Sequence, residues 1–159
     1  MQYYTDDEIA EILRRSGKIL GIETDKDSLI EISKRSRSTP RTANYLLKRA
    51  RDYAAVSEEK LDLKSVRRAL ALLEIDEGGL NQTDRDILTL LIEKFNGGPV
   101  GLKTIAAALS EEEATIEEVN EPYLMQIGLI ERTPRGRVAT KKAYAHMGFR
   151  PPRGQETLL

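Results

Sequence analysis

The sequence contains no cysteine and no tryptophan, and aromatic residues make up only 5% of its 159 positions. Without cysteine, the chain has no disulfide bond, no thiolate ligand for zinc and no cysteine nucleophile. This composition fits a reducing compartment. Together with a charged fraction of 32%, it favours small helical domains over a sheet-rich enzyme. We therefore predict a mainly α-helical protein.

Long apolar runs are also missing from the sequence. The longest are far shorter than the roughly 20 consecutive residues that a membrane-spanning helix requires, and the first residues do not have the pattern of a signal peptide. We expect a cytoplasmic protein that makes no contact with a membrane.

The residue types of ordinary catalytic sites are scarce. Histidine occurs once, as His146, and no metalloprotease, serine-hydrolase or calcium-loop motif is present. The stretch NGGPVGLKT at 96–104 is similar to a phosphate loop, but Leu102 separates Gly101 from Lys103. A phosphate loop also follows a buried strand, whereas this stretch follows a predicted helix. We interpret it as a helix–helix connection, and we expect no catalytic residue and no metal site in this chain.

Charges of opposite sign are segregated along the chain, although the net charge is only -1. Residues 32–51 contain seven Lys or Arg and no acid, whereas residues 77–131 contain eleven acids and three bases. Residues 132–159 contain seven bases and one acid. Because a polyanion responds to local rather than total charge, the two basic segments are candidate contacts for phosphate groups.

The first 75 residues have the apolar periodicity of four helices. The first helix follows the capping box TDDE at residues 5–8, and the second and fourth are expected at about 26–37 and 62–73. The third starts at Pro40, with Ser38 or Thr39 as its cap. Two glycines then interrupt the pattern, and we place a linker at residues 76–81.

A second domain is predicted over residues 82–148. Helices are expected at 82–95, about 102–109 and about 112–127, followed by the extended runs LIERT and RVAT joined by PRG. Three helices followed by a hairpin are typical of a winged-helix domain. Residues 149–159 are rich in proline and glycine and predict a flexible tail.

The third of these helices carries many carboxylates, which we interpret as a solvated face: Glu111, Glu112, Glu113, Glu117, Glu118 and Glu121. A helix this acidic is repelled by DNA. We therefore expect DNA contact at the hairpin instead, where Arg132, Arg135 and Arg137 surround the turn. The alternative that the arginines are merely solvated stays open.

Arg41 lies at the start of the third predicted helix, where the helix dipole disfavours a cation. It is either an ordinary surface arginine or a side chain that reaches a bound anion such as a nucleotide phosphate. The sequence physics does not decide between the two.

Four segments together resemble the RuvB family of AAA+ motors that drive Holliday-junction branch migration: RSRSTPRTANYLLKRARDYA, EKFNGGPVGLKTIAAAL, EPYLMQIGLIERTPRGRVAT and AYAHMG. The resemblance extends from Tyr3 to Gly148. It implies a helical lid domain over residues 1–75 and a winged-helix DNA-binding domain over 82–148. It also implies that the large ATPase domain, with its Walker motifs, is absent from this sequence.

The resemblance implies roles for individual residues. Arg41 matches the sensor-2 arginine that reaches the nucleotide phosphates, and Tyr4 matches an aromatic residue beside the nucleotide, although Tyr4 could equally form a hydrophobic staple with Ile9. Arg132 and Arg137 match wing residues that contact DNA, with Arg135 as a third. The family commonly has glycine where this chain has serine at position 38, and we expect little effect.

Further expectations follow from the resemblance. Members form a hexameric ring around duplex DNA at Holliday junctions, act in recombination and repair, hydrolyse ATP to ADP with Mg2+ held by the large domain, and bind RuvA through that domain. We expect this chain alone to be inactive as an ATPase. The alternatives are a sequence-specific winged-helix regulator or replication-initiator fragment, and a protein-interaction module that uses the acidic helix.

Overall fold

The computed structural model describes residues 3–153. The chain divides into two compact units, residues 1–81 and residues 82–159, which we call the N-terminal unit and the C-terminal unit. Each is described by itself. Of the predicted flexible tail, residues 154–159 lie outside the described residues.

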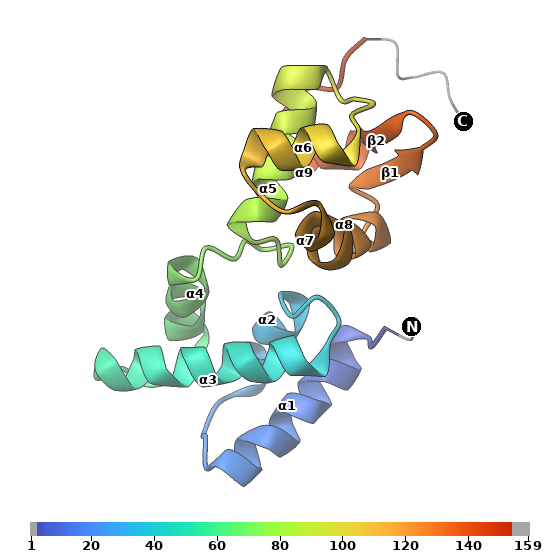
Figure 1. Cartoon of the computed structure of the whole chain (residues 1–159). Coiled ribbons are helices and arrows are strands. Elements are labelled where there is room, and N and C mark those ends of the chain that lie inside the picture. The colour runs from blue at the N-terminus through green and yellow to red at the C-terminus, as the bar shows by residue number, and fades with distance from the viewer. Residues whose placement is uncertain (1–2, 154–159) are drawn as a thin grey trace. The chain divides into compact units, whose positions relative to one another are not determined.

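The N-terminal unit consists of helices (blue to green in Figure 1): α1 (Asp6–Leu20), α2 (Lys26–Lys34), α3 (Pro40–Val56) and α4 (Leu63–Leu72). Their apolar faces meet in one core whose large, fully buried side chains are Ile9, Leu13, Ile32, Leu46, Leu47 and Leu70. Burial of this kind contributes about 1.5–3 kcal/mol for each large apolar side chain. The unit is therefore held together by apolar packing between its helices.

Side-chain caps fix where these helices begin. The predicted capping box is confirmed, because the Glu8 N–H donates to the Thr5 hydroxyl (3.2 Å) and the Thr5 N–H donates to the Glu8 carboxylate (2.7 Å). Asp25 and Asp62 cap α2 and α4 in the same way. These contacts satisfy amide groups that have no partner within the helix.

The second helix ends three residues earlier than the sequence pattern predicts. It stops at Lys34, and Arg37 and Ser38 both adopt left-handed backbone angles with φ of 57°. A right-handed helix cannot continue through such residues. Of the two predicted caps of α3, Thr39 is the one that accepts from the Thr42 N–H (3.3 Å).

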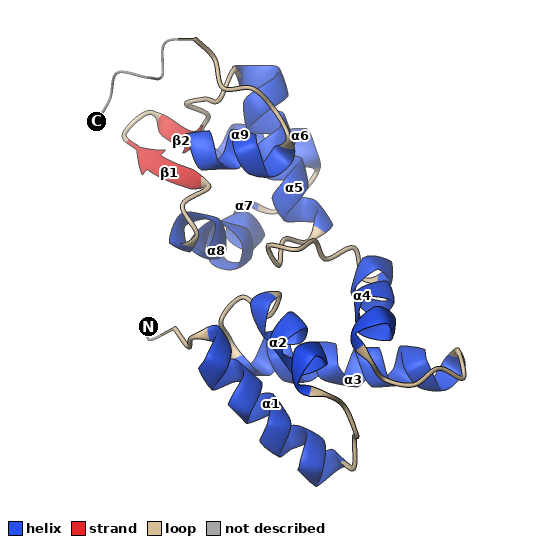
Figure 2. Cartoon of the chain, turned by 180° about the vertical axis from the view of Figure 1, so that it is seen from behind, coloured by secondary structure: helices blue, strands red, loops and turns tan. Residues whose placement is uncertain are grey.

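The C-terminal unit begins with α5 (Gln82–Thr89), which continues into the π-helical turn η1 (Leu90–Lys94), and then α6 (Leu102–Leu109). A third helical segment is built from α7 (Glu113–Thr115), η2 (Ile116–Asn120) and α8 (Glu121–Gln126). It is followed by a hairpin, β1 (Ile130–Thr133) and β2 (Gly136–Ala139), and by α9 (Lys141–Met147). The predicted mainly α fold with a small β-wing is confirmed, and the two strands are red in Figure 2.

We call the hairpin of residues 130–139 the wing. Its strands are antiparallel, with Arg132 opposite Arg137 and Thr133 opposite Gly136. The Thr133 hydroxyl donates to the Gly136 carbonyl (2.8 Å) and accepts from the Arg135 N–H (3.2 Å). These bonds give the turn a defined shape.

The glycine-rich stretch joins η1 to α6, as predicted, and it also pairs with the wing. Val100 exchanges two backbone hydrogen bonds with Arg137, of 3.0 and 2.7 Å. A Cβ atom at Gly136 would lie 2.4 Å from the Val100 carbonyl carbon, and one at Gly98 would lie 2.4 Å from the Arg137 carbonyl oxygen. The glycines are therefore explained by close backbone approach and not by a bound phosphate.

The final helix, α9, was missed by the sequence analysis, which treated RVAT as the last regular segment. Thr140 caps it by accepting from the Ala143 N–H (3.3 Å), and Gly148 ends it with φ of 75°. Two local signals for this helix were present in the sequence: Thr140 can cap its start, and Gly148 follows its last residue.

Candidate nucleic-acid interface

The wing brings two of its arginines to the same face. Arg132 and Arg137 are direct cross-strand partners, and side chains of directly opposed residues project from the same side of a hairpin. Arg135 lies in the turn and is exposed. The three residues predicted to contact DNA thus lie on one hairpin. Arg132 and Arg137 are paired across its strands, and Arg135 lies in its turn.

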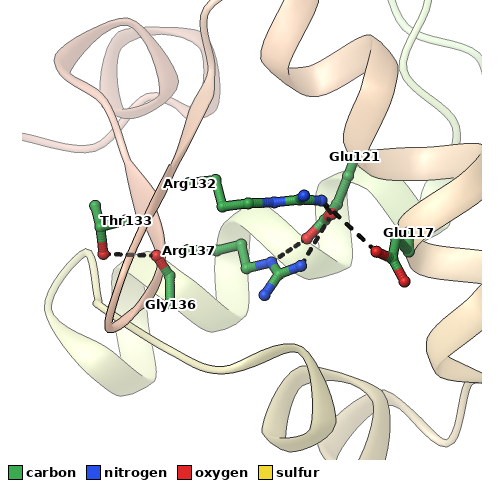
Figure 3. Close-up of polar contacts among 6 residues, drawn as sticks. All are labelled: Glu117, Glu121, Arg132, Thr133, Gly136 and Arg137. Carbon is green, nitrogen blue, oxygen red and sulfur yellow. Dashed lines mark hydrogen bonds and ion pairs between the residues drawn. The ribbon is translucent and has the colours of Figure 1, made fainter.

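Glu121, the first residue of α8, lies between the two paired arginines (Figure 3). The Arg137 guanidinium donates from Nε to Oε1 and from Nη2 to Oε2, the second bond measuring 3.2 Å. Arg132 donates from Nη2 to Oε2 at 2.7 Å. One carboxylate therefore accepts three charge-assisted hydrogen bonds, which are stronger than hydrogen bonds between neutral groups.

This geometry corrects the interpretation of Glu121 as part of a solvated face. Glu121 is only 1% exposed, whereas Glu117 and Glu118 are exposed as expected. The helix position explains the difference, because Glu121 lies three residues before the buried Leu124 and so shares its inward face. That spacing was the available signal, since an acid on a buried helix face requires a cationic partner.

The position of the acidic helix is fixed by a second buried polar contact. The Asn120 amide donates to the Asp84 carboxylate at 2.7 Å, which links η2 to α5. Both side chains are buried. Glu121 therefore projects toward the wing from a segment that is itself held in place.

The surroundings of Glu121 favour its ionised form. Burial alone would raise the pKa of Glu121, but hydrogen bonds from Arg137 and then Arg132 outweigh it and lower that pKa below its ordinary value. In turn, the hydrogen bond to Glu121 raises the pKa of Arg132. At neutral pH the three side chains carry a net charge of +1, so one of the two arginine charges is neutralised locally.

The three wing arginines differ in accessibility. The side chain of Arg132 is 48% exposed and that of Arg137 is 14% exposed, while Arg135 is exposed in the turn. Lys141 and Lys142 follow the wing and are also exposed. Lys142 donates to the Ile127 carbonyl at 2.6 Å, so part of its donor capacity is already used.

In the N-terminal unit, the structure brings Tyr4 next to the turn that precedes Arg41. The Tyr4 N–H donates to the Ser38 carbonyl at 3.4 Å. The side chains of Tyr4 and Arg41 are exposed, that of Tyr4 by 44%. The first turn of α3 contains no acid, and within residues 3–153 Arg41 forms no ion pair or hydrogen bond through its side chain. Arg41 is thus free to bind an anion.

These residues suit part of a nucleotide site. An unpaired guanidinium can bind phosphate oxygens, and an exposed tyrosine ring can pack against a base. The hollow of about 430 Å³ beside Tyr4 is lined by the carboxylates of Asp7, Glu8 and Glu11 and by one cation, Arg15. Its acids outnumber its bases, and such carboxylates repel phosphate. The nucleotide contact of Arg41 and Tyr4 therefore stays a prediction.

Other common types of site are absent from the part of the chain that the structure describes. Within residues 3–153, no group of three or more His, Cys, Asp or Glu side chains could hold a metal ion. Over the same residues, every helix is too short or too polar to cross a bilayer.

Each unit matches the model of a known domain family. The RuvB AAA lid domain model matches residues 4–76, and the RuvB C-terminal winged helix domain model matches residues 77–148. A curated relative, the Holliday junction branch migration complex subunit RuvB of Trichormus variabilis, is 54% identical over 160 residues, covering 100% of this chain and 44% of the relative. The subunit of the same name from Lactobacillus gasseri is 51% identical, covering 98% of this chain and 46% of its own length.

A solved structure, that of the Thermotoga maritima RuvB Holliday junction branch migration motor, superposes with a TM-score of 0.90 at 42% identity. The match covers 96% of this chain and 51% of that chain. The chain therefore spans about half the length of the relatives that it matches.

Proposed function

The chain belongs to the RuvB family and comprises its lid and winged-helix domains, and from that premise we propose that it forms part of an ATP-driven motor acting on Holliday-junction DNA. Within that motor, the wing binds the DNA backbone and the lid contacts the nucleotide. The observation that carries the proposal is the exposure of Arg132 and Arg135 on a hairpin whose neighbouring helix is strongly acidic.

The charge distribution favours a backbone contact over base reading. In many winged-helix proteins the third helix enters the major groove, but here Glu117 and Glu118 are exposed on that helix and would repel phosphates. The cations lie on the wing instead. Contacts to phosphate carry no sequence information, which suits a motor that must pass along any sequence.

Arg41 and Tyr4 supply the proposed nucleotide contact. ATP or ADP brings phosphate oxygens that an unpaired guanidinium binds well. Arg41 at the start of α3 would link the charge of the nucleotide to the position of the lid. Assembly into a hexamer, contact with RuvA and a Mg2+ site on the large domain follow from the resemblance and remain predictions.

DNA binding by the full chain tests the proposal. Fluorescence anisotropy would be measured with two duplexes of unrelated sequence and a four-way junction, at salt concentrations from about 50 to 200 mM. We expect similar affinities for the two duplexes. Arg135→Ala should flatten the slope of log K against log salt by about 0.9, which corresponds to one lost phosphate contact.

A matched control is Lys18→Ala, which removes an exposed cation from the last turn of α1. It should leave DNA binding unchanged. A preference of about 10³-fold or more for one duplex would indicate a sequence-specific regulator instead. Absence of binding at low salt would reject the DNA-binding role of the wing.

A further inference from the structure

We propose that Asn44 is a further nucleotide-binding residue, whose side-chain NH2 group donates to the same phosphate chain as Arg41. The inference rests on the proposed nucleotide contact of Arg41. It adds an uncharged donor to a site for which the family resemblance implies only Arg41 and Tyr4. Asn44 lies in α3, three residues after Arg41.

The side-chain amide of Asn44 has no partner in the described part of the chain. Within residues 3–153, neither end of this amide forms a hydrogen bond. Its Oδ1 atom is buried, although the residue as a whole is only half-buried. Because Oδ1 is the buried end, the NH2 group is the end that reaches the surface. Its two N–H donors are therefore open to a ligand.

The buried end of this amide costs stability, and that cost points to a ligand at the other end. A buried polar atom without a hydrogen-bond partner is destabilising, and each such group in a folded protein requires an explanation. Asn44 borders the apolar core, because its neighbours Ala43 and Leu47 on α3 are buried. A leucine of similar shape would occupy the same position without an unpaired oxygen. The open NH2 group is the feature that leucine cannot supply.

Asn44 and Arg41 are neighbours on the surface of α3. Helical residues three apart have their Cβ atoms about 5–6 Å from each other. Arg41 is exposed and has no side-chain partner within residues 3–153. A guanidinium and an NH2 group at this separation can donate to different oxygens of one triphosphate. Residues 32–51 contain no acid, so no carboxylate of this segment competes for the two donors.

The backbone that carries the two side chains is fixed where α3 begins. The Thr39 hydroxyl accepts from the Thr42 N–H at 3.3 Å, and the Thr39 N–H donates to the Ser36 carbonyl at 3.2 Å. A ligand that binds to groups on a rigid backbone loses less entropy than one that must order a loop. Arg41 and Asn44 are therefore presented together before a ligand binds.

The alternative role for Asn44 is structural, and the two roles predict different results for Asn44→Leu. A structural role predicts a variant that is less stable than the parent. A ligand-binding role predicts an unchanged or higher midpoint of chemical denaturation, because an unpaired buried oxygen is removed. It also predicts ATP binding that is weaker by about three- to tenfold, through the loss of one hydrogen bond. Since asparagine and leucine are both uncharged, a change in net charge cannot cause this loss.

The decisive experiment titrates the full chain with ATP and, separately, with tripolyphosphate, and follows the nuclear magnetic resonance spectrum. Both ligands should shift the side-chain NH2 signals of Asn44 in the parent. Asn44→Leu and Asn44→Ala should weaken the binding of both ligands by a similar factor, because neither residue supplies a donor. The control is Lys48→Ala, which removes an exposed cation one turn further along α3. It should lower the affinity less than either Asn44 variant, although it alone removes a charge.

Three results would overturn the inference. The first is parent-like affinity for ATP in the Asn44 variants. The second is a loss of stability in both variants, which would make Asn44 a structural residue. The third is a shift of the Asn44 signals by ATP but not by tripolyphosphate, which would put the nucleoside and not the phosphate chain beside the amide. If Asn44→Leu does not fold, Asn44→Ala carries the test alone.

Arg41→Ala separates failure of this inference from failure of the proposed function. If Arg41→Ala abolishes the response to ATP while the Asn44 variants keep parent-like affinity, the lid binds nucleotide but Asn44 is not one of its binding residues. If the parent chain itself does not respond to millimolar ATP, the nucleotide contact of the lid is rejected, and the role of Asn44 with it.

Discussion

Each unit presents an arginine that the family resemblance ties to a phosphate, but the two are held in opposite ways. Arg41 in the N-terminal unit is exposed and, among residues 3–153, has no side-chain partner. Arg137 in the C-terminal unit is mostly covered and forms a fork on a buried carboxylate. A cation without a partner is available to a ligand and contributes little to folding, whereas breaking a buried ion pair destabilises the fold.

The charge segregation of the sequence accounts for this contrast. Residues 32–51 contain no acid, so the surroundings of Arg41 in the chain offer no carboxylate. Residues 77–131 are rich in acids, and one of them, Glu121, turns inward to meet the wing. The same segregation thus leaves one arginine free and pairs the other.

The largest expected effect is on the stability of the C-terminal unit. Glu121→Ala leaves the Arg137 guanidinium without its carboxylate in a nearly buried position. Removing one member of a buried pair costs about 3 kcal/mol, at the lower end of the usual range because Arg137 is not fully buried. Amide hydrogen exchange measures this separately for residues 113–139 and residues 6–20.

Only the first of these segments should lose protection in Glu121→Ala. The matched control is Glu118→Ala, which removes an exposed acid from the same helical segment and should change stability by less than about 0.5 kcal/mol. Equal effects of the two substitutions would show that the Glu121 cluster does not stabilise the fold, and the contrast with Arg41 would fail.

A smaller loss of stability of the C-terminal unit is expected when the pH is lowered. The pKa of Glu121 in the folded protein lies below its ordinary value of 4.5, because the hydrogen bonds from Arg137 and Arg132 outweigh the effect of burial. Its stabilisation is therefore complete above about pH 4.5 and is lost as the pH falls through the lower folded value. Thermal unfolding of the C-terminal unit, measured as a function of pH, should show this loss.

Glu121→Gln provides the control for the acid effect, because glutamine does not titrate. The difference in unfolding temperature between the parent and this variant should shrink as the pH falls below about 4.5. In the N-terminal unit, the pKa of Glu11 is also lowered, to about 2, mainly by the hydrogen bond from Arg14. Because Glu11 is exposed, its ion pair contributes little to stability. A difference that stayed constant down to pH 2 would show that Glu121 does not ionise differently in the folded protein.

Local patterns in the sequence were sufficient for most of the fold. The Thr5 capping box, the start of α3 at Pro40 and the bounds of α6 depend on neighbouring residues, and all were predicted correctly. The end of α2 was not, since the left-handed angles at Arg37 and Ser38 arise where the chain must turn into α3. Helix α9 was overlooked although its capping signals are local.

The candidate site was only partly predictable. The wing arginines were found because a basic hairpin after an acidic helix is visible in the sequence. The buried state of Glu121 was not predicted, because its partners lie 11 and 16 residues away and meet it only through hairpin register and helix packing. Sequence periodicity could place Glu121 on the buried face of its helix but could not show which cations pair with it.

The turn of the wing and the turn before Arg41 also differ, in the type of residue that adopts a positive φ. The difference leads to a smaller prediction. In the wing, the positive φ of 133° is taken by Gly136, whereas before Arg41 the positive φ of 57° is taken by Ser38. Left-handed angles are unfavourable for residues with a Cβ atom. The Ser38 hydroxyl forms no hydrogen bond within residues 3–153, so Ser38→Gly removes strain without removing a contact.

Ser38→Gly should therefore stabilise the N-terminal unit by about 0.5–1 kcal/mol, after allowing for the greater freedom of glycine in the unfolded chain. Chemical denaturation followed by circular dichroism measures the change. Ser57→Gly is the control, because Ser57 is exposed with φ of -81°, an angle that serine adopts readily. If Ser38→Gly destabilises the unit as much as the control does, the turn before Arg41 is not strained.

The smallest expected effect on stability is that of Arg41→Ala. The substitution removes a cation from the first turn of α3, where the helix dipole disfavours it, and breaks no side-chain contact among the described residues. The free energy of unfolding should change by less than about 0.5 kcal/mol.

ATP should perturb the backbone amide signals of Tyr4 and Thr39 in the nuclear magnetic resonance spectrum of the parent chain and leave them unperturbed in the variant. Lys48→Ala, which removes an exposed cation from the same helix, should retain the response to ATP. A loss of more than about 1 kcal/mol in Arg41→Ala would mean that Arg41 is a structural residue like Arg137, because a side chain that only awaits a ligand adds almost nothing to the stability of the free protein.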